Sequence, residues 1–238
     1  MSTNPPHHHH PAPGSATAIV VAAGSGVRLG AVRSGRPVPK ALVEVGGRPL
    51  VAHAVEGLLA AGVPDVVVAV PDEHRGEFAA LLPAEVTLVA GGATRTASVR
   101  NALAHCVAGD GPVLVHDAAR PFTPAAVVTR VLAALAAGAR AVVPVLPVVD
   151  TTVEVDGDRV VTEVARDALR RVQTPQGFDR ATLLAAYAAV TDEQAYTDDA
   201  SVVRAQGVVV HTVAGDELAA KITVPHDLVQ AEHRLAAR

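Results

Sequence analysis

The sequence has few of the residues on which several classes of protein depend. Among 238 residues there is no Trp, there are two Tyr and three Phe, and Cys106 is the single cysteine. So few rings argue against a module that stacks bare bases on aromatic side chains, and one cysteine excludes an internal disulfide. No apolar run approaches the roughly 20 residues that a membrane-spanning helix needs. These shortages favour a cytoplasmic protein that binds neither nucleic acid nor membrane.

The chain also lacks an excess of positive charge. Its formal net charge is -4 at pH 7, so it has no general attraction for anions, and any anion site must be local. Half of the residues are hydrophobic, which is enough for a sizeable core in a chain of this length. Residues 1–16 are rich in Pro and His and have no signal- or transit-peptide pattern. We therefore expect a disordered tail over 1–16 and a single domain over 17–238.

What remains is a regular alternation of strand-like and helix-like segments. Strands are predicted at 17–23, 65–70, 85–90, 111–117, 139–145, 208–213 and from Lys221 to Pro225, and helices at 49–61, 74–82, 94–104, 124–137, 180–190, 198–206 and from His226. Several strands are continuous apolar runs, which is typical of strands covered on both faces. This order predicts an α/β, Rossmann-like fold, with helices on both faces of a mostly parallel sheet.

One segment breaks the alternation. Residues 151–164 alternate polar and apolar side chains around Asp156-Gly157, which is a strong hairpin signal. A hairpin between two units of a parallel sheet predicts a protruding arm, over about 148–170. Such an arm would cover a site or grip a second subunit.

The first strand runs into a glycine-rich turn, "AIVVAAGSGVRLG", at 18–30. Glycines let backbone N–H groups approach phosphate oxygens, and Arg28 and Lys40 would add positive charge. The dinucleotide-binding fingerprint does not fit, because Leu29 stands where its third glycine belongs, and a Walker A motif is absent. The turn indicates phosphate binding of another kind.

Two further strand ends carry candidate residues. In "GGATRTASVRNAL" (91–103), Thr94 or Thr96 could cap a helix, and Ser98 would face back toward the turn. The N-terminus of this helix could read a nucleobase edge; taken alone, the segment favours a capped helix with Arg95 and Arg100 in solvent. In "VHDAARP" (115–121), Asp117 ends a buried strand. A carboxylate there is costly unless it meets a cation, a metal ion or a ligand hydroxyl.

Taken in order, the motifs resemble those of one family. They are A-A-G-x-G-x-R, P-K, G-G-x-x-R-x-x-S-V, H-D-A-A-R-P, the D-T at 150–151, T-P-Q, T-D-D-A-S and K-I-T-x-P-x-D-L, and they extend from about residue 17 to 235. The chain resembles the 2-C-methyl-D-erythritol 4-phosphate cytidylyltransferases of the non-mevalonate isoprenoid pathway. The resemblance implies a fold of the nucleotide-diphospho-sugar transferase type. It also implies transfer of CMP from CTP to 2-C-methyl-D-erythritol 4-phosphate with a divalent cation such as Mg²⁺.

The resemblance assigns roles to matching positions. It implies catalytic cations at Arg28, Lys40 and Lys221, nucleotide contacts at Ala22, Ala23, Gly24, Gly26, Gly91, Ser98, Asp117 and Ala118, and substrate contacts at Arg120, Thr151, Arg166 and Thr174. Gly91 and Ser98 would read cytosine, and the metal would be held by Asp117 or through the CTP phosphates. Thr151 and Arg166 would reach from the arm into the site of a neighbouring subunit, which implies a homodimer.

Two alternatives stay open on the sequence. A ribitol-5-phosphate cytidylyltransferase would share the scaffold and the nucleotide motifs. A nucleotide-binding regulatory module that has lost the chemistry is the alternative from another class, although Arg28, Lys40 and Lys221 are all present.

Overall fold

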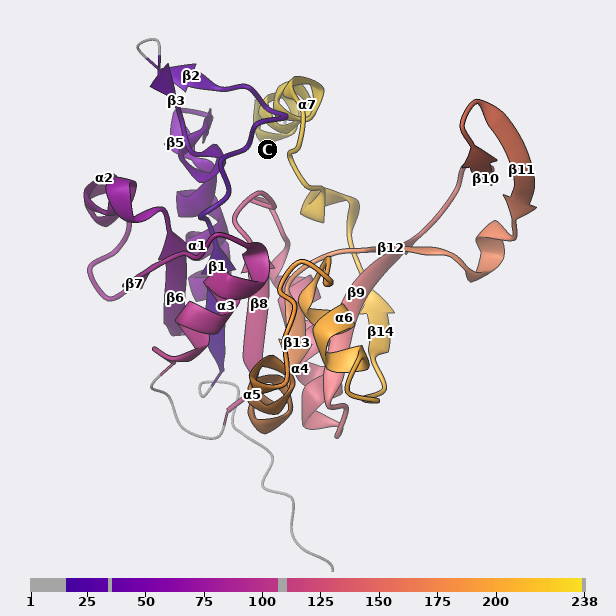
Figure 1. Cartoon of the computed structure of the whole chain (residues 1–238). Coiled ribbons are helices and arrows are strands. Elements are labelled where there is room, and N and C mark those ends of the chain that lie inside the picture. Colours follow the sequence, from indigo (N-terminus) through magenta and orange to yellow (C-terminus); the bar gives the residue numbers. More distant parts are fainter. Residues whose placement is uncertain (1–15, 34–35, 107–110, 237–238) are drawn as a thin grey trace, which may run out of the picture.

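Figure 1 shows the computed structural model of the chain, which describes residues 16–33, 36–106 and 111–236. The tail expected over residues 1–16 lies outside this part, apart from Ala16. Within the described residues an eight-stranded sheet carries helices on both of its faces. The expected α/β class is therefore confirmed.

The strands lie in an order that differs from their order in the sequence. Across the sheet the order is β12 (Arg170–Val172), β9 (Ala141–Pro147), β13 (Gln176–Phe178), β8 (Val113–Asp117), β1 (Thr17–Val21), β6 (Asp65–Val70) and β7 (Thr87–Ala90), with β14 (His211–Ala214) also paired to β9. β8, β1, β6 and β7 are parallel neighbours, and β14 is parallel to β9. β12 and β13 run antiparallel to the strands that they contact. The sheet is thus mostly parallel, as the alternation predicts.

Helices cover the sheet in two layers. The residues buried on one face include side chains of α1 (Leu50–Ala60), α2 (Arg75–Leu81) and α4 (Ala125–Ala136), and those on the other include side chains of α3 (Arg95–Leu103), α5 (Arg180–Ala188) and α6 (Asp199–Arg204). α7 (Pro225–Ala236) ends the described chain, and short 3-10 helices are η2 (Lys40–Leu42), η3 (Asp72–His74), η4 (Arg166–Ala168) and η5 (Glu217–Ala219). None of the helices in these ranges is both long and apolar enough to cross a membrane.

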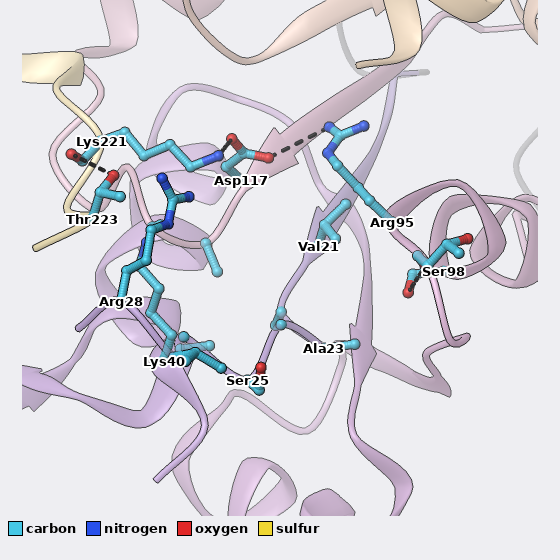
Figure 2. Close-up of a pocket in the computed structure, with 18 of the residues that line it drawn as sticks. Val21, Ala23, Ser25, Arg28, Lys40, Arg95, Ser98, Asp117, Lys221 and Thr223 are labelled. Atoms are coloured by element: carbon cyan, nitrogen blue, oxygen red, sulfur yellow. Dashed lines mark hydrogen bonds and ion pairs between the residues drawn. The ribbon is translucent and has the colours of Figure 1, made fainter. Parts of the chain in front are cut away.

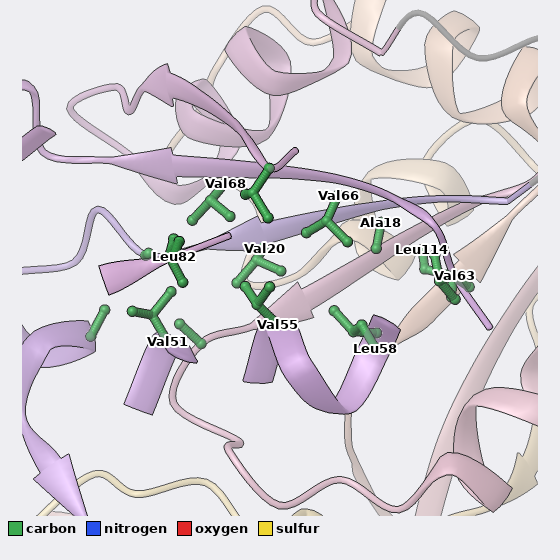
Figure 3. Packing of buried hydrophobic residues seen from close by; sticks show 14 of the residues in the cluster. Ala18, Val20, Val51, Val55, Leu58, Val63, Val66, Val68, Leu82 and Leu114 are labelled. Atoms are coloured by element: carbon green, nitrogen blue, oxygen red, sulfur yellow. The ribbon is translucent and has the colours of Figure 1, made fainter. Parts of the chain in front are cut away.

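The central strand β1 is apolar after its first residue, Thr17, because helices cover both of its faces. Val20 is fully buried in the cluster that includes Val55 and Leu58 of α1, as Figure 3 shows. Ile19, its neighbour, is fully buried in the opposite cluster, which includes Val99 of α3. Because both faces of the strand are covered, residues 18–21 are all apolar. Thr17, at the start of the strand, is also buried, and its hydroxyl donates to Asp65 Oδ2 at 2.9 Å.

The expected strand from Lys221 to Pro225 is wrong. Residues 220–224 are irregular, and the N–H groups of Thr223 and Val224 both donate to Asp227 Oδ2, at 2.7 and 3.0 Å. These groups cap the start of α7 and are not available to a sheet. The strand expected at 208–213 is displaced, since β14 begins at His211.

Several short elements were not predicted. Besides β12 and β13, they are the small hairpins β2–β3 (Val32–Arg33 and Arg36–Pro37) and β4–β5 (Glu44–Val45 and Arg48–Pro49). All of these strands are two or three residues long, which is too short for a periodic pattern.

The hairpin expected at 151–164 is present. β10 (Thr152–Asp156) and β11 (Arg159–Val164) pair antiparallel across a turn in which Gly157 has a φ of 59°. Figure 1 shows this hairpin projecting from the sheet beyond β9 and β12. Its valines are exposed, Val155 at 61% and Val160 at 67%.

Candidate active site

A cavity of about 590 Å³ lies at the carboxyl ends of β1 and β8. It is lined by Val21–Arg28 after β1, Lys40 and Ala41, Gly92–Arg95 and Ser98 at the start of α3, Asp117–Ala119 after β8, and Lys221 and Thr223. From β1 the chain continues through β6 and β7 before it returns to β8 on the other side. Ligands of open α/β sheets bind at such a point, where the strand order reverses.

The glycine-rich turn after β1 brings two cations together. Gly26 has a φ of 67°, and a Cβ at this position would overlap the Cβ of Lys40. The Lys40 N–H also donates to the Gly24 carbonyl, at 3.4 Å. Only glycine allows this approach, and it places Lys40 beside Arg28 on one wall of the cavity, as Figure 2 shows.

Asp117 is the buried carboxylate of the site and is surrounded by cations. Its Oδ2 accepts from Lys221 Nζ at 2.8 Å, its Oδ1 lies 3.4 Å from Arg95 Nη2, and Arg120 Nε is 3.9 Å from Oδ2. Burial by itself would raise the pKa of Asp117, but Arg95, Lys221 and Arg120 together hold that pKa well below its ordinary value. Asp117 is therefore ionised at every physiological pH.

Opposite charges compensate Lys40 only in part. Burial and the neighbouring charge of Lys221 lower its pKa to about 8, with a further contribution from Arg28, while Asp117 acts in the opposite direction. With Arg28, Lys40 and Lys221 set against Asp117, the wall carries more positive than negative charge. This is the local positive charge that an anion site would need in a chain of negative net charge.

The start of α3 forms the opposite wall. Thr94 is the N-cap, and its hydroxyl accepts from the Ala97 N–H at 2.9 Å. Ser98 Oγ accepts from the Gly92 N–H at 3.0 Å and donates to the Thr94 carbonyl at 2.9 Å, so it fixes the turn before the helix. Gly91 packs closely against Ala23, and a Cβ at position 91 would overlap that of Ala23. Of the two residues expected to read cytosine, Ser98 lines the cavity and Gly91 does not.

Arg95 is a residue that sequence reasoning placed wrongly. Its side chain is not in solvent but is 26% exposed, with Nη2 2.7 Å from Asp199 Oδ2. Asp199 is fully buried and also accepts from the Tyr187 hydroxyl at 2.6 Å. The T-D-D-A-S motif holds Asp199, but a buried partner so far along the chain leaves no local signal.

Arg120 and Thr174, expected to line the substrate pocket, lie behind Asp117. The buried Thr174 hydroxyl accepts from the Asp117 N–H at 3.1 Å, and Arg120 donates to the Ala219 and Val172 carbonyls at 2.7 and 3.3 Å. Neither residue is among those that line the cavity described above. Thr174 binds the backbone of Asp117 and Arg120 lies near its carboxylate, so both residues support Asp117.

His116 completes this support. It is buried, with Nε2 3.2 Å from the Arg120 carbonyl and Nδ1 2.9 Å from the Thr174 hydroxyl. Since a carbonyl only accepts, Nε2 carries the proton and Nδ1 accepts from Thr174. Burial lowers the pKa of His116 to about 4, so the ring is neutral at physiological pH.

Thr151 and Arg166, the remaining predicted contacts, are exposed on the arm. Arg166 Nη1 donates to the Val149 carbonyl, at 2.7 Å, within the arm itself. Figure 1 shows the arm directed away from the part of the sheet that carries the cavity. Within one chain these two residues do not join the site.

The described residues contain no group of three His, Cys, Asp or Glu side chains able to hold a metal ion. Asp117 is the one carboxylate among the residues that line the cavity. Mg²⁺ is commonly held by one or two carboxylates together with substrate phosphates. This donor set therefore fits an ion that enters with a nucleotide, and not a resident metal centre.

Comparison with known proteins agrees with this geometry. The family model of 2-C-methyl-D-erythritol 4-phosphate cytidylyltransferase matches residues 16–237. The chain belongs to this cytidylyltransferase family. A relative of that name from Nocardia farcinica is 54% identical over 229 residues, which cover 94% of this chain and 96% of the relative. Another from Rhodococcus opacus is 50% identical and covers 92% and 94% of the two chains.

Solved structures of cytidylyltransferases have the same fold. The enzyme from Thermus thermophilus matches with a TM-score of 0.75 at 38% identity and covers 93% of this chain and 99% of its own. A further relative, matched by sequence, is the bifunctional enzyme IspD/IspF of Clavibacter michiganensis, which is 46% identical over 92% of this chain and 54% of that protein.

Proposed function

We propose that this protein transfers CMP from CTP to 2-C-methyl-D-erythritol 4-phosphate, giving 4-diphosphocytidyl-2-C-methyl-D-erythritol and pyrophosphate. The observation that carries the proposal is the wall of Arg28, Lys40 and Lys221 at the strand ends of a chain of this family. That wall fits a triphosphate, and the wall at the start of α3 fits a nucleobase. We further propose a cytoplasmic location, which a single, buried cysteine supports.

In the proposed reaction a phosphate oxygen of the sugar phosphate attacks the α-phosphorus of CTP. A new P–O bond forms while the bond to the pyrophosphate breaks, and the electron pair leaves with pyrophosphate. The attacking oxygen is already anionic, so no general base is needed. The residues must hold two anions together and balance the charge on the α-phosphate. We assign this task to Arg28, Lys40 and Lys221, which line the cavity.

The nucleotide would lie across the cavity between its two walls. Ala22, Ala23, Gly24 and Gly26 present small side chains and backbone toward the nucleoside and the phosphates, with Ala118 on the ribose side. Ser98 would act on cytosine through the turn that it fixes, and Gly91 by letting Ala23 pack closely. A divalent cation such as Mg²⁺ would be held by the CTP phosphates and Asp117, and would offset phosphate charge.

For the sugar phosphate we propose a site shared between two copies of the chain. Two-stranded hairpins are marginal alone in water, and this one exposes valines such as Val155 and Val160. A homodimer would cover them and bring Thr151 and Arg166 of one copy to the cavity of the other, near Arg120 and Thr174.

The test is pyrophosphate release from CTP and Mg²⁺, with methylerythritol 4-phosphate and ribitol 5-phosphate assayed in parallel. Release with methylerythritol 4-phosphate alone supports the proposal. Release with ribitol 5-phosphate alone keeps the chemistry but changes the substrate. If the folded protein binds CTP but releases no pyrophosphate with either compound, it is a regulatory module.

A further inference from the structure

The three cations of the site stand on segments that the sheet does not fix. Arg28 is in the turn after β1, Lys40 begins the 3-10 helix η2, and Lys221 is in the irregular segment before α7. Near Lys221 the Ile222 N–H donates to the Ala119 carbonyl at 2.9 Å. A triphosphate needs all three cations at set positions, so a further element must hold these segments together.

A small hydrophobic cluster, separate from the two clusters on the sheet, lies behind these cations. Its buried residues are Leu29, Val45, Leu50, Ile222 and Ala231, and Val43, Leu228 and Leu235 pack against them. Leu29 follows Arg28, Val43 follows η2, and Ile222 follows Lys221. α7 supplies Leu228, Ala231 and Leu235 to the same cluster, so one helix shares this cluster with a residue close to each of the three cations.

Polar contacts fix α7 at both of its ends. At the start, Asp227 Oδ2 accepts from the N–H groups of Thr223 and Val224, next to Lys221. Near the end, both carboxylate oxygens of Glu232 accept from the Gly46 N–H, at 3.0 and 3.1 Å. Gly46 is in the turn of the β4–β5 hairpin, and this hairpin directly follows η2 and Lys40.

The turn is shaped to receive the helix. Gly46 and Gly47 both have positive φ, 59° and 71°. A Cβ on Gly46 would overlap Leu235 Cδ2, whereas a Cβ on Gly47 would meet nothing within 4 Å. Leu235 therefore occupies the space that a side chain at Gly46 would need, and α7 lies against the β4–β5 hairpin in the upper part of Figure 1.

We infer that α7 is a positioning element for nucleotidyl transfer, in which Glu232 and Leu235 hold the Lys40 segment at a fixed distance from Lys221. Neither side chain lines the cavity, so the effect on CTP passes through the β4–β5 turn. The inference rests on the proposed function for its kinetic readout. CTP binding provides a readout that does not depend on turnover.

The first experiment compares Glu232→Ala, Glu232→Gln and, as a control on the same helix, the exposed His233→Ala. CTP binding is measured by calorimetry, and pyrophosphate release by kinetics. Glu232→Ala should lower CTP affinity and kcat/KM for CTP about tenfold, the scale of one hydrogen bond to a charged group. Glu232→Gln keeps an acceptor and should recover most of the loss. The KM for the sugar phosphate and all values for His233→Ala should match the wild type.

The second experiment uses the paired glycines. Gly46→Ala and Gly47→Ala impose the same kind of strain at a positive φ, but only the first meets Leu235. Gly46→Ala should weaken CTP binding more than Gly47→Ala does. Adding Leu235→Ala to Gly46→Ala should restore part of the lost CTP affinity, because the smaller side chain leaves space for the new Cβ.

The outcomes separate the two proposals. If Glu232→Ala and Gly46→Ala lower the Tm but leave CTP affinity and kcat/KM for CTP at wild-type values, α7 only stabilises the fold and the inference is wrong. An equal rise in the KM for the sugar phosphate would also overturn it. If the wild type binds CTP but transfers CMP to neither sugar phosphate, the proposed function fails, and calorimetry on the variants still decides the role of α7.

Discussion

Burial and two neighbouring cations set the charge of Lys40 near neutral pH. Its pKa is lowered to about 8, which makes it the cation of the site that a modest rise in pH would discharge. Bound CTP adds negative charge beside Lys40 and favours the protonated form, so the effect belongs to the free enzyme.

We therefore expect kcat/KM for CTP to fall as the pH rises through about 8, because kcat/KM reports groups of the free enzyme. The fall in kcat should come at a higher pH. Steady-state rates from about pH 6.5 to about 9.5 would measure both. Lys40→Arg stays charged over this range and should remove the fall in kcat/KM; an unchanged profile in Lys40→Arg would assign the titration to another group.

Burial of His116 should make the free energy of unfolding depend on pH. Its pKa of about 4 in the folded protein is below the ordinary value of 6.5, so between these values the unfolded chain binds a proton that the folded protein does not. The free energy of unfolding should therefore fall with falling pH, by up to about 1.4 kcal/mol per pH unit from this residue. Urea unfolding near pH 7 and pH 5 would show it. His116→Gln should flatten the dependence and the exposed His105→Gln should not.

At the scale of elements, α3 makes two ion pairs of different burial with the segment that leads into α6. Arg95 pairs with Asp199, which is fully buried, and Arg100 pairs with Glu193, whose side chain is 29% exposed. Asp199 also receives the Tyr187 hydroxyl, so this carboxylate links α3, α5 and α6. The two pairs provide a direct comparison of a buried and a half-exposed contact.

Asp199→Asn should lower the free energy of unfolding by about 3 kcal/mol, because it leaves the Arg95 charge without its buried partner. Glu193→Gln should cost less than about 1 kcal/mol, as half-exposed pairs do. Denaturant unfolding of both variants is the measurement. Equal costs would mean that Arg95 finds a substitute partner in Asp117.

The elements that the sequence predicts well are those whose own residues decide the structure. The buried strands 17–23, 65–70 and 111–117 and the helix at 49–61 are all present with small shifts at their ends. β13 could not be predicted, because it is three residues long and forms only where β8 and β9 leave a gap between them.

The same limit applies to the site. Arg28, Lys40, Asp117 and Lys221 meet in one cavity, and each stands in a motif visible in the sequence. Arg95 was expected in solvent because its buried partner is contributed by a different helix. The support of Lys40 by α7 likewise depends on packing between distant segments.

At the scale of the whole molecule, the arm is a part of the chain that contributes no residue to the cavity of the same chain. Arg166 and Thr151 are exposed and are not among the residues that line the cavity, and Figure 1 shows their arm projecting away from β1 and β8. If two copies exchange their arms, Arg166 acts only on the sugar phosphate, because CTP is held by residues of the other chain.

Arg166→Ala should therefore raise the KM for methylerythritol 4-phosphate by about tenfold or more, the scale of a lost hydrogen bond to a charged group, with little change in the KM for CTP. Arg159→Ala, in the other part of the same hairpin, is the control. Initial rates at varied concentrations of each substrate measure both constants. A rise of equal size in both KM values would argue against a shared site.

The antiparallel strand β13 joins two parts of the sheet, and this arrangement affects how the folded protein opens. β7, β6, β1 and β8 lie on one side of it and β9, β12 and β14 on the other, and in the described chain three residues make the only strand between them. A Cβ on its central Gly177 would overlap Val131 and Leu135 of α4, so this junction is tightly packed and short. The buried clusters on both faces also run across β13, since Leu114 of β8 shares one with Val142 of β9 and Ile19 of β1 shares the other with Val143 of β9. Amide hydrogen exchange should therefore show β8 and β9 opening as one cooperative unit, and CTP bound at the cavity should slow exchange on both sides of β13.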